Sequence, residues 1–363
     1  MSSLKHKLKP ILKNSQNLPL STLIFPILLI TLLIAFLLDI ALGSAQIPLN
    51  QVITILLGQQ PEKITWTNIV LKFRLPKALT ASLAGAALGV SGLQMQTLFR
   101  NPLAGPFVLG ISSGASLGVA LVVLTATATG APALFQDLGI IGDFGLVIAA
   151  SLGAASVLGI TLIVSRRIQD TMTLLILGLL FGYATSAIVS ILLHFSSQER
   201  IQSYLTWTFG SFAGVTWKQM VVLAPVVLSG LLVALLLSKP LNALLLGESY
   251  ARSLGLTVQK ARFFIITSAS VLAGAMTAFC GPIAFLGVAI PHLCRSLFHT
   301  SDHRVLIPAV MIMGAILALF ADLISQLPGN DIVLPLNAVT ALIGTPVVTW
   351  VILRRNSQNS FPS

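Results

Sequence analysis

The sequence has few charged residues, and acidic ones are the scarcest. Only 9% of the 363 residues are charged, 10 of them acidic and 21 basic, whereas 55% are hydrophobic. Soluble globular chains carry about a quarter charged residues, so this composition excludes a cytosolic enzyme, a secreted module and a disordered tail. The two cysteines are too few to build a disulfide framework or a zinc site. With a mean hydropathy of +0.95, the chain is expected to be an all-α polytopic membrane protein.

Positive charges outnumber negative ones, which gives a formal net charge of +11. In a soluble protein this balance would indicate nucleic acid as a partner. Here the basic residues stand between long apolar runs, as they do in membrane proteins, whose orientation they fix. We therefore expect a membrane setting and no nucleic acid.

A nucleotide-binding motif is also missing. The sequence contains no Gly-Lys dipeptide and therefore no Walker A loop, so the chain cannot use ATP by itself. We expect no enzymatic activity and no cofactor of its own. Histidines between residues 292 and 303 suggest a metal site, but their spacing is not that of a compact ligand set, so we expect none.

The apolar runs predict about ten membrane-spanning helices, each of roughly 20 residues. The uncharged windows are 14–38, 78–99, 103–124, 144–165, 171–198, 219–238, 263–294, 305–321 and 332–353. The window 263–294 would be about 48 Å long as one helix. Gly281-Pro282 interrupts it, and we therefore predict one helix over 262–280 and a second from near residue 283.

The basic residues predict that both termini are cytoplasmic. Lysines crowd the tail 1–18, and Arg354 and Arg355 precede the tail 356–363. Because positive residues favour the cytoplasmic side, an even number of spans follows. Residues 19–355 are expected to form one multi-pass transmembrane domain.

A short pattern repeats in the second and seventh predicted spans. Residues 83–86 read Leu-Ala-Gly-Ala and are followed by Gly92, and residues 272–275 repeat them with Gly281 at the same spacing. The copies are offset by five spans, an odd number, so they cross the membrane in opposite directions. This is typical of the inverted repeats of transporters, although small residues also recur in any tightly packed helix. We predict inverted five-helix pseudo-repeats.

Ionisable residues inside the spans are few. Asp39 and Asp322 stand near span ends, where we expect hydrogen-bonded helix termini close to the outer surface. A carboxylate series through the membrane is missing, which argues against an ion-coupled secondary transporter, the main alternative from a different class.

Ordered motifs run through both halves of the chain. The first half contains Arg74-Leu75-Pro76-Lys77, Ser91-Gly92, Asn101-Pro102-Leu103-Ala104 and Leu109–Ala115. The second half contains Trp207, Gly210-Ser211, Leu246-Gly247-Glu248, Leu254-Gly255, Gly281–Gly287, Pro291-His292, Asp302-His303-Arg304, Ala321-Asp322 and Gly344-Thr345-Pro346. From about residue 20 to residue 355, the chain resembles the FecCD-type permeases, the membrane subunits of ABC importers for iron-siderophores, haem and vitamin B12.

This resemblance implies the partners. They are a second permease subunit, identical or a sister chain, a cytoplasmic ABC ATPase dimer that binds ATP and magnesium, and a periplasmic or lipid-anchored substrate-binding protein. The implied function is import of a ferric-siderophore complex, and the implied location is the bacterial inner (plasma) membrane. A haem or vitamin B12 importer is the alternative within the family, and a membrane-embedded enzyme is the most distant alternative.

The resemblance also implies residue roles. A coupling helix at about 240–258 would dock on the ATPase through Leu246, Gly247, Glu248, Ala251, Arg252, Leu254 and Gly255. Arg74 and Lys77 would be exposed at the outer mouth and would receive the binding protein. Gate and translocation-path residues would be Thr171, Met172, Gln96, Asn101 and Pro102. Lys77 stands where the family more often has arginine, and Gln326 where a third outer arginine is frequent.

Overall fold

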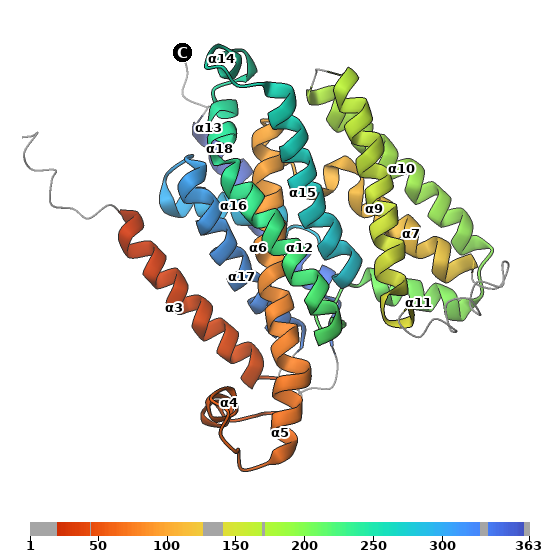
Figure 1. The fold of residues 1–363 in the computed structure, drawn as a ribbon, viewed down its shortest axis with the longest axis vertical. Coiled ribbons are helices and arrows are strands. Elements are labelled where there is room, and N and C mark those ends of the chain that lie inside the picture. The colour runs from red at the N-terminus through yellow and green to blue at the C-terminus, as the bar shows by residue number, and fades with distance from the viewer. Residues whose placement is uncertain (1–19, 44, 126–140, 169–170, 327–332, 359–363) are drawn as a thin grey trace, which may run out of the picture.

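The computed structural model describes residues 20–43, 45–125, 141–168, 171–326 and 333–358, and every regular element in these ranges is helical. Figure 1 shows the arrangement. The helices are α3 (Leu20–Ala41), α4 (Leu49–Leu56), α5 (Ile64–Asn68), η1 (Ile69–Arg74), α6 (Leu75–Leu98), η2 (Pro106–Leu109), α7 (Ile111–Thr125), α9 (Ile141–Arg167), α10 (Thr171–His194), α11 (Gln198–Thr208), α12 (Trp217–Leu236), α13 (Ser238–Leu245), α14 (Glu248–Ser253), α15 (Val258–Cys280), α16 (Leu286–Phe298), α17 (His303–Ser325) and α18 (Leu336–Gln358).

The predicted spans correspond to helices in the described ranges. By length and composition, seven helices there can cross a membrane, namely α3, the continuous helix Ile64–Leu98, α9, α10, α12, α15 and α17. Shorter apolar helices, α7, α16 and α18, fall at the other three predicted spans. The predicted break is confirmed, because α15 ends at Cys280 and Gly281 takes a φ of 75°, which favours glycine.

The second spanning helix begins earlier than its uncharged window, 78–99. Helix α4 is followed by α5 and by η1, a π-helical stretch, and the helix is continuous from Ile64 into α6. The window began only after Lys77, but Arg74 and Lys77 are buried in the protein, so their charges do not end the helix.

Helix α6 is the centre of the packing. It contacts α17, α15, α16 and α12. Glycines allow the closest approaches: a Cβ on Gly85 would collide with the backbone of Gly314 in α17, and one on Gly92 with the backbone of Gly287 in α16. Small residues at helix contacts are what membrane proteins use to pack backbones closely.

The two copies of the repeated pattern run in opposite directions, as predicted. Figure 1 shows α6 and α15 antiparallel. Side-chain contacts join them, since Ser91 Oγ donates to the Ala269 carbonyl at 2.7 Å and Gln94 Nε2 donates to Ser268 Oγ at 3.2 Å. These buried hydrogen bonds fix the register of the two helices.

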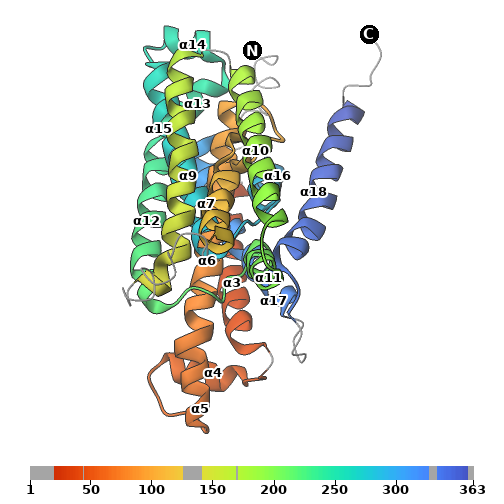
Figure 2. The same cartoon turned by 90° about the vertical axis from the view of Figure 1, so that its right-hand side faces the viewer.

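Both terminal helices begin or end on the same side of the molecule. Figures 1 and 2 show the start of α3, the end of α18 and α14 at one end, which we call the α14 end, while α4 and α5 lie at the opposite, α5 end. A chain that crosses the membrane an even number of times must begin and end on the same side, so this arrangement agrees with the predicted even number of spans.

Candidate functional site

The predicted coupling segment forms two short helices, α13 and α14, at the α14 end. Glycines bound α14 on both sides, as the sequence predicted: Gly247 has a φ of 105° and Gly255 a φ of 84°. Both angles lie in the left-handed region, where a side chain would be strained. The chain therefore turns sharply before and after α14 and presents it as a separate element.

This segment exposes apolar side chains. Tyr250 lies in α14, Leu246 follows the end of α13 and Leu254 follows the end of α14, and they are 53%, 62% and 60% exposed. Ala251 of α14 is fully buried. An exposed apolar row next to charged residues is typical of a protein–protein contact.

The opposite side of α14 is tied to the helix bundle by charge. Glu248 Oε1 lies 2.6 Å from Arg262 Nη2 in α15, and its Oε2 lies 3.5 Å from Arg252 Nη2. Arg262 Nη1 also donates to the Ile168 carbonyl, at 3.2 Å, just beyond the end of α9. A force on α14 is therefore transmitted to α15 and to the end of α9 through one buried arginine.

The predicted path residues Gln96, Asn101 and Pro102 come together at the α14 end of α6. Gln96 is buried, its Nε2 donates to the Val288 carbonyl at 3.1 Å, and its Oε1 accepts from Arg295 Nη1 at 2.6 Å. The Pro102 carbonyl lies 2.7 Å from His292 Nε2. These contacts fasten the turn after α6 to α16. A role in the substrate path stays a prediction.

The turn itself is formed locally. Asn101 Oδ1 accepts the N–H of Leu103 at 2.9 Å, and Arg100 adopts a φ of 47°. An asparagine that bonds the backbone two residues on stabilises such a turn. The predicted gate residues Thr171 and Met172 begin α10, with Met172 58% exposed, and their gating role is also still a prediction.

A polar network near α14 was missed by the sequence analysis. Asn242 Oδ1 lies 2.7 Å from His303 Nδ1, and the other ring nitrogen lies 2.8 Å from Thr97 Oγ1. Asn242 Nδ2 also donates to Asp302 Oδ1 at 2.6 Å. The network joins α13, α17 and α6 and so supports the base of the coupling segment. Within the described ranges, no group of three metal-ligating side chains of the His, Cys, Asp or Glu type occurs.

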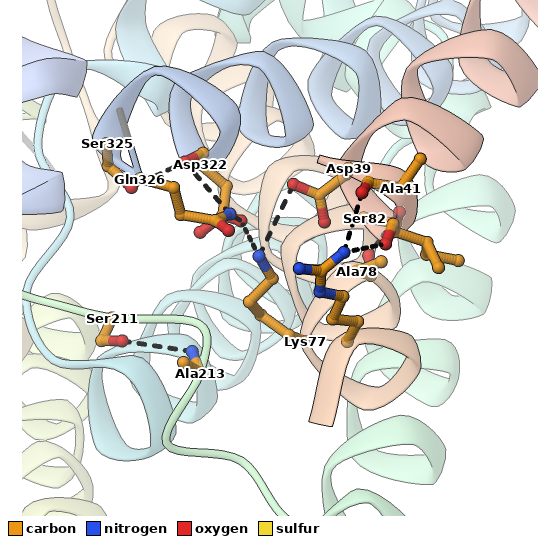
Figure 3. Close-up of polar contacts among 12 residues, drawn as sticks. Asp39, Ala41, Lys77, Ala78, Ser82, Ser211, Ala213, Asp322, Ser325 and Gln326 are labelled. Atoms are coloured by element: carbon orange, nitrogen blue, oxygen red, sulfur yellow. Dashed lines mark hydrogen bonds and ion pairs between the residues drawn. The ribbon is translucent and has the colours of Figure 1, made fainter. Parts of the chain in front are cut away.

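The expected exposure of Arg74 and Lys77 is wrong. Both side chains are buried, at 7% and 6% exposed. Lys77 Nζ lies 2.7 Å from Asp322 Oδ2 in α17 and 3.8 Å from Asp39 Oδ1 in α3 (Figure 3). Gln326 Nε2 donates to the same Asp322 oxygen at 2.6 Å. We call Asp39, Lys77 and Asp322 the buried charge cluster.

Arg74 is held by backbone carbonyls beside this cluster. Its Nη1 donates to Ile40 and Ala41 at 2.7 and 2.8 Å, and its Nη2 donates to Ala45. The guanidinium thus satisfies carbonyls at the end of α3. Since both cations face inward, docking of a binding protein by Arg74 and Lys77 would require them to leave these partners. That docking role stays a prediction.

Two Gly-x-Ser-x-Gly patterns, at 110–114 and 114–118, occupy the start of α7. In hydrolases this pattern stands at a sharp turn between a strand and a helix. Here Ser112 Oγ lies 2.9 Å from the hydroxyl of Thr277 in α15, and a Cβ on Gly114 or Gly118 would collide with α9. The pattern serves helix packing.

The fold and the site together define a polytopic helical membrane protein with a short, glycine-bounded helix at one end. Residues 31–354 match the model of the FecCD transport family. The chain therefore belongs to the FecCD transport family and is a transport permease, as the sequence motifs predicted.

Curated relatives agree over nearly the whole length. The chain is 37% identical over 330 residues to the vitamin B12 import system permease protein BtuC of Klebsiella pneumoniae, covering 90% of this chain and 92% of the relative. It is 35% identical over 328 residues to the protein of the same name from Shigella boydii, covering 90% and 93%.

A solved structure has the same fold. It is an inward-facing ABC transporter of the metal-chelate type, with a TM-score of 0.76 and 27% sequence identity. The match covers 92% of this chain and 99% of that one.

Proposed function

We propose that this chain is the membrane-spanning subunit of a binding-protein-dependent ABC importer for a metal chelate. The observation that carries the proposal is α14, a glycine-bounded helix that exposes Tyr250, is flanked by the exposed Leu246 and Leu254, and is tied to the bundle through Glu248 and Arg262. The chain has no Walker A loop, so a separate ATPase dimer would supply the energy and would bind ATP and magnesium.

In this proposal the ATPase binds the exposed side chains of Leu246, Tyr250 and Leu254 from the cytoplasm. Closure of the ATPase dimer on ATP displaces α14, and the Glu248–Arg262 pair passes this displacement to α15. Because α15 is hydrogen-bonded to α6 at the centre of the packing, its movement changes the packing of the whole bundle. The α14 end and both termini then face the cytoplasm of a bacterial cell, and a second permease subunit completes the path.

The substrate has two main candidates, both metal chelates. A ferric siderophore is the substrate predicted from the sequence. Vitamin B12, a cobalt chelate, is the second candidate, because the curated relatives at 35–37% identity are named for it. Haem belongs to the same class of substrate. A binding protein on the outer side would select among them.

The coupling proposal is tested with Leu254→Asp in the reconstituted complex with its ATPase. Leu254 is exposed, so the variant should fold, but a carboxylate in an apolar contact should abolish substrate-stimulated ATP hydrolysis and uptake. Leu57→Asp is the matched control, because Leu57 is 69% exposed and follows α4 at the α5 end. Equal uptake by the Leu254 variant and the wild type would refute the assignment of α14.

The link between α14 and α15 has its own test. Glu248→Lys, or deletion of residues 247–254, should leave a folded chain whose partner ATPase hydrolyses ATP without driving uptake.

The substrate is tested by uptake of radiolabelled iron as several siderophore chelates, and of labelled cobalamin, in cells with and without the gene. Loss of a single ferric chelate would establish a siderophore importer, and loss of cobalamin alone would establish the second candidate.

A further inference from the structure

The α14 ends of α9 and α15 form a cavity that the proposed transport mechanism leaves unused. Its volume is about 660 Å³, and it is lined by Ser165, Gln259, Lys260, Arg262, Phe263 and Phe264. Figures 1 and 2 both show α9 and α15 side by side on one face of the molecule. A volume of several hundred cubic ångströms is that of a ligand site.

The polar lining of this cavity favours an anion. Lys260 is exposed and Arg262 is buried, and Ser165 and Gln259 add neutral donors. The described residues that line the cavity include no carboxylate. The nearest acid is Glu248, which already shares Arg262. A phosphate group accepts several hydrogen bonds and matches a lysine and an arginine that line the same cavity.

The apolar lining places this anion site at a membrane surface. Phe263 and Phe264 stack edge to face with ring centroids 5.5 Å apart, and Phe264 is 51% exposed on the outside of the bundle. Basic and aromatic side chains meet in this way where a helix leaves the hydrocarbon core. The cavity also lies at the ends of two long apolar helices, as an interfacial site requires.

Below the polar cavity, the same pair of helices forms a second, apolar cavity with α12. Its volume is about 390 Å³, and its walls are mostly Phe, Val, Ile, Leu and Ala side chains. Its near end is at Ser270 of α15, eight residues beyond Arg262 and therefore about 12 Å along the helix. This distance is less than half of the roughly 30 Å hydrocarbon core. We call the polar cavity and the apolar cavity together the groove. It has cations at the membrane surface and apolar walls beneath them.

We propose that this groove binds an anionic phospholipid, with the phosphate in the polar cavity against Lys260 and Arg262 and an acyl chain along α9 and α15. Basic pockets between membrane helices bind anionic headgroups through the same chemistry. Since Arg262 also holds Glu248, the lipid phosphate and α14 share one cation. Occupancy of the groove is therefore linked to the position of α14. Only this link to coupling rests on the proposed function, because lipid binding itself requires no ATPase.

The test is photolabelling of the purified full-length chain in nanodiscs. The probe is phosphatidylglycerol with a diazirine on its acyl chain, and the labelled peptides are mapped by mass spectrometry. We expect labelling at residues 144–158 and 270–279, which line the apolar cavity, with roughly fivefold weaker apparent affinity in Lys260→Gln, the effect of about one lost cation near a membrane surface. Lys260→Arg should retain the affinity. Lys239→Gln is the matched control, an exposed lysine of α13 at the same end of the molecule.

Three results would overturn the proposal. The first is equal labelling of the groove by phosphatidylcholine and phosphatidylglycerol probes. The second is displacement of the lipid probe by millimolar inorganic phosphate, which would make a free anion the ligand. The third is unchanged labelling in Lys260→Gln together with weaker assembly with the ATPase, which would make the cavity part of a protein contact. The labelling is done on the chain alone, so it can fail while the coupling experiment succeeds, and the reverse also holds.

Discussion

Replacing Lys77 with methionine should destabilise the protein strongly. The ammonium group is the cation of the buried charge cluster, 2.7 Å from one carboxylate oxygen of Asp322 and 3.8 Å from one of Asp39. Methionine fills a similar volume but leaves both carboxylates buried without a cation. Asp39 depends on Lys77 most, because its two oxygens accept no hydrogen bond in the structure.

The magnitude follows from these distances. With an effective dielectric constant of about 20, the two attractions are on the order of 6 and 4 kcal/mol. Desolvation of three charged groups offsets much of this gain, and removing one partner of a buried pair costs about 3–5 kcal/mol. We therefore expect Lys77→Met to lower the free energy of unfolding by about 3–5 kcal/mol. Adding Asp322→Asn to that variant should recover a substantial part, since one buried charge is then removed.

The assay is reversible unfolding in mixed detergent micelles, compared among wild type, Lys77→Met and the double variant. Lys72→Met is the matched control, because Lys72 lies five residues before Lys77, in the adjoining π-helical stretch η1, but is exposed, and it should stay within about 0.5 kcal/mol of wild type. If Lys77→Met is as stable as this control, the cluster does not stabilise the fold. A stable Lys77→Met variant that no longer docks the binding protein would instead support the docking role of Lys77.

Other substitutions test the packing and the helix ends. Gly85→Ala should destabilise the protein by more than 2 kcal/mol, on the order of an overpacked core, because its Cβ would collide with Gly314, whereas Gly159→Ala in α9 meets open space and should change thermal stability little. Asp302→Ala should cost about 1 kcal/mol in the same unfolding assay, because Asp302 caps α17 by accepting the N–H of Arg304. That N–H lowers the pKa of Asp302, so its contribution is present above the unfolded pKa of about 3.9 and is lost as the pH falls through the lower folded value. A difference between wild type and Asp302→Asn that grows as the pH falls would contradict this sign.

Much of the fold could be predicted from the sequence because it depends on local properties. The length of an apolar run decides whether a helix can cross a membrane, and the glycine and proline at 281 and 282 end α15 through their own backbone preferences. The glycine-bounded α14 could be found for the same reason. The opposite directions of the two repeat copies followed from counting the spans between them.

The candidate site could be predicted only in part. The coupling residues were found as a motif, but the Glu248–Arg262 pair and the Asn242–His303 contact join residues far apart in the chain. A sequence shows where the charged and polar residues are, but not which of them form ion pairs or hydrogen bonds in the folded protein. The polar residues at the end of α6 were likewise expected along a path and are found fastened to α16.

The sequence by itself determined that this chain is a helical membrane protein of about ten spans with a short, glycine-bounded helix, since hydrophobic length, breakers and motifs are properties of consecutive residues. Only the tertiary structure decided which charged side chains are buried. Arg74 and Lys77 stand in a segment that looks like an exposed outer loop, and they are buried because the ends of α3 and α17 close over them. Burial of a charge is set by neighbours hundreds of residues away, and a lysine is stable inside the protein only where those neighbours bring carboxylates.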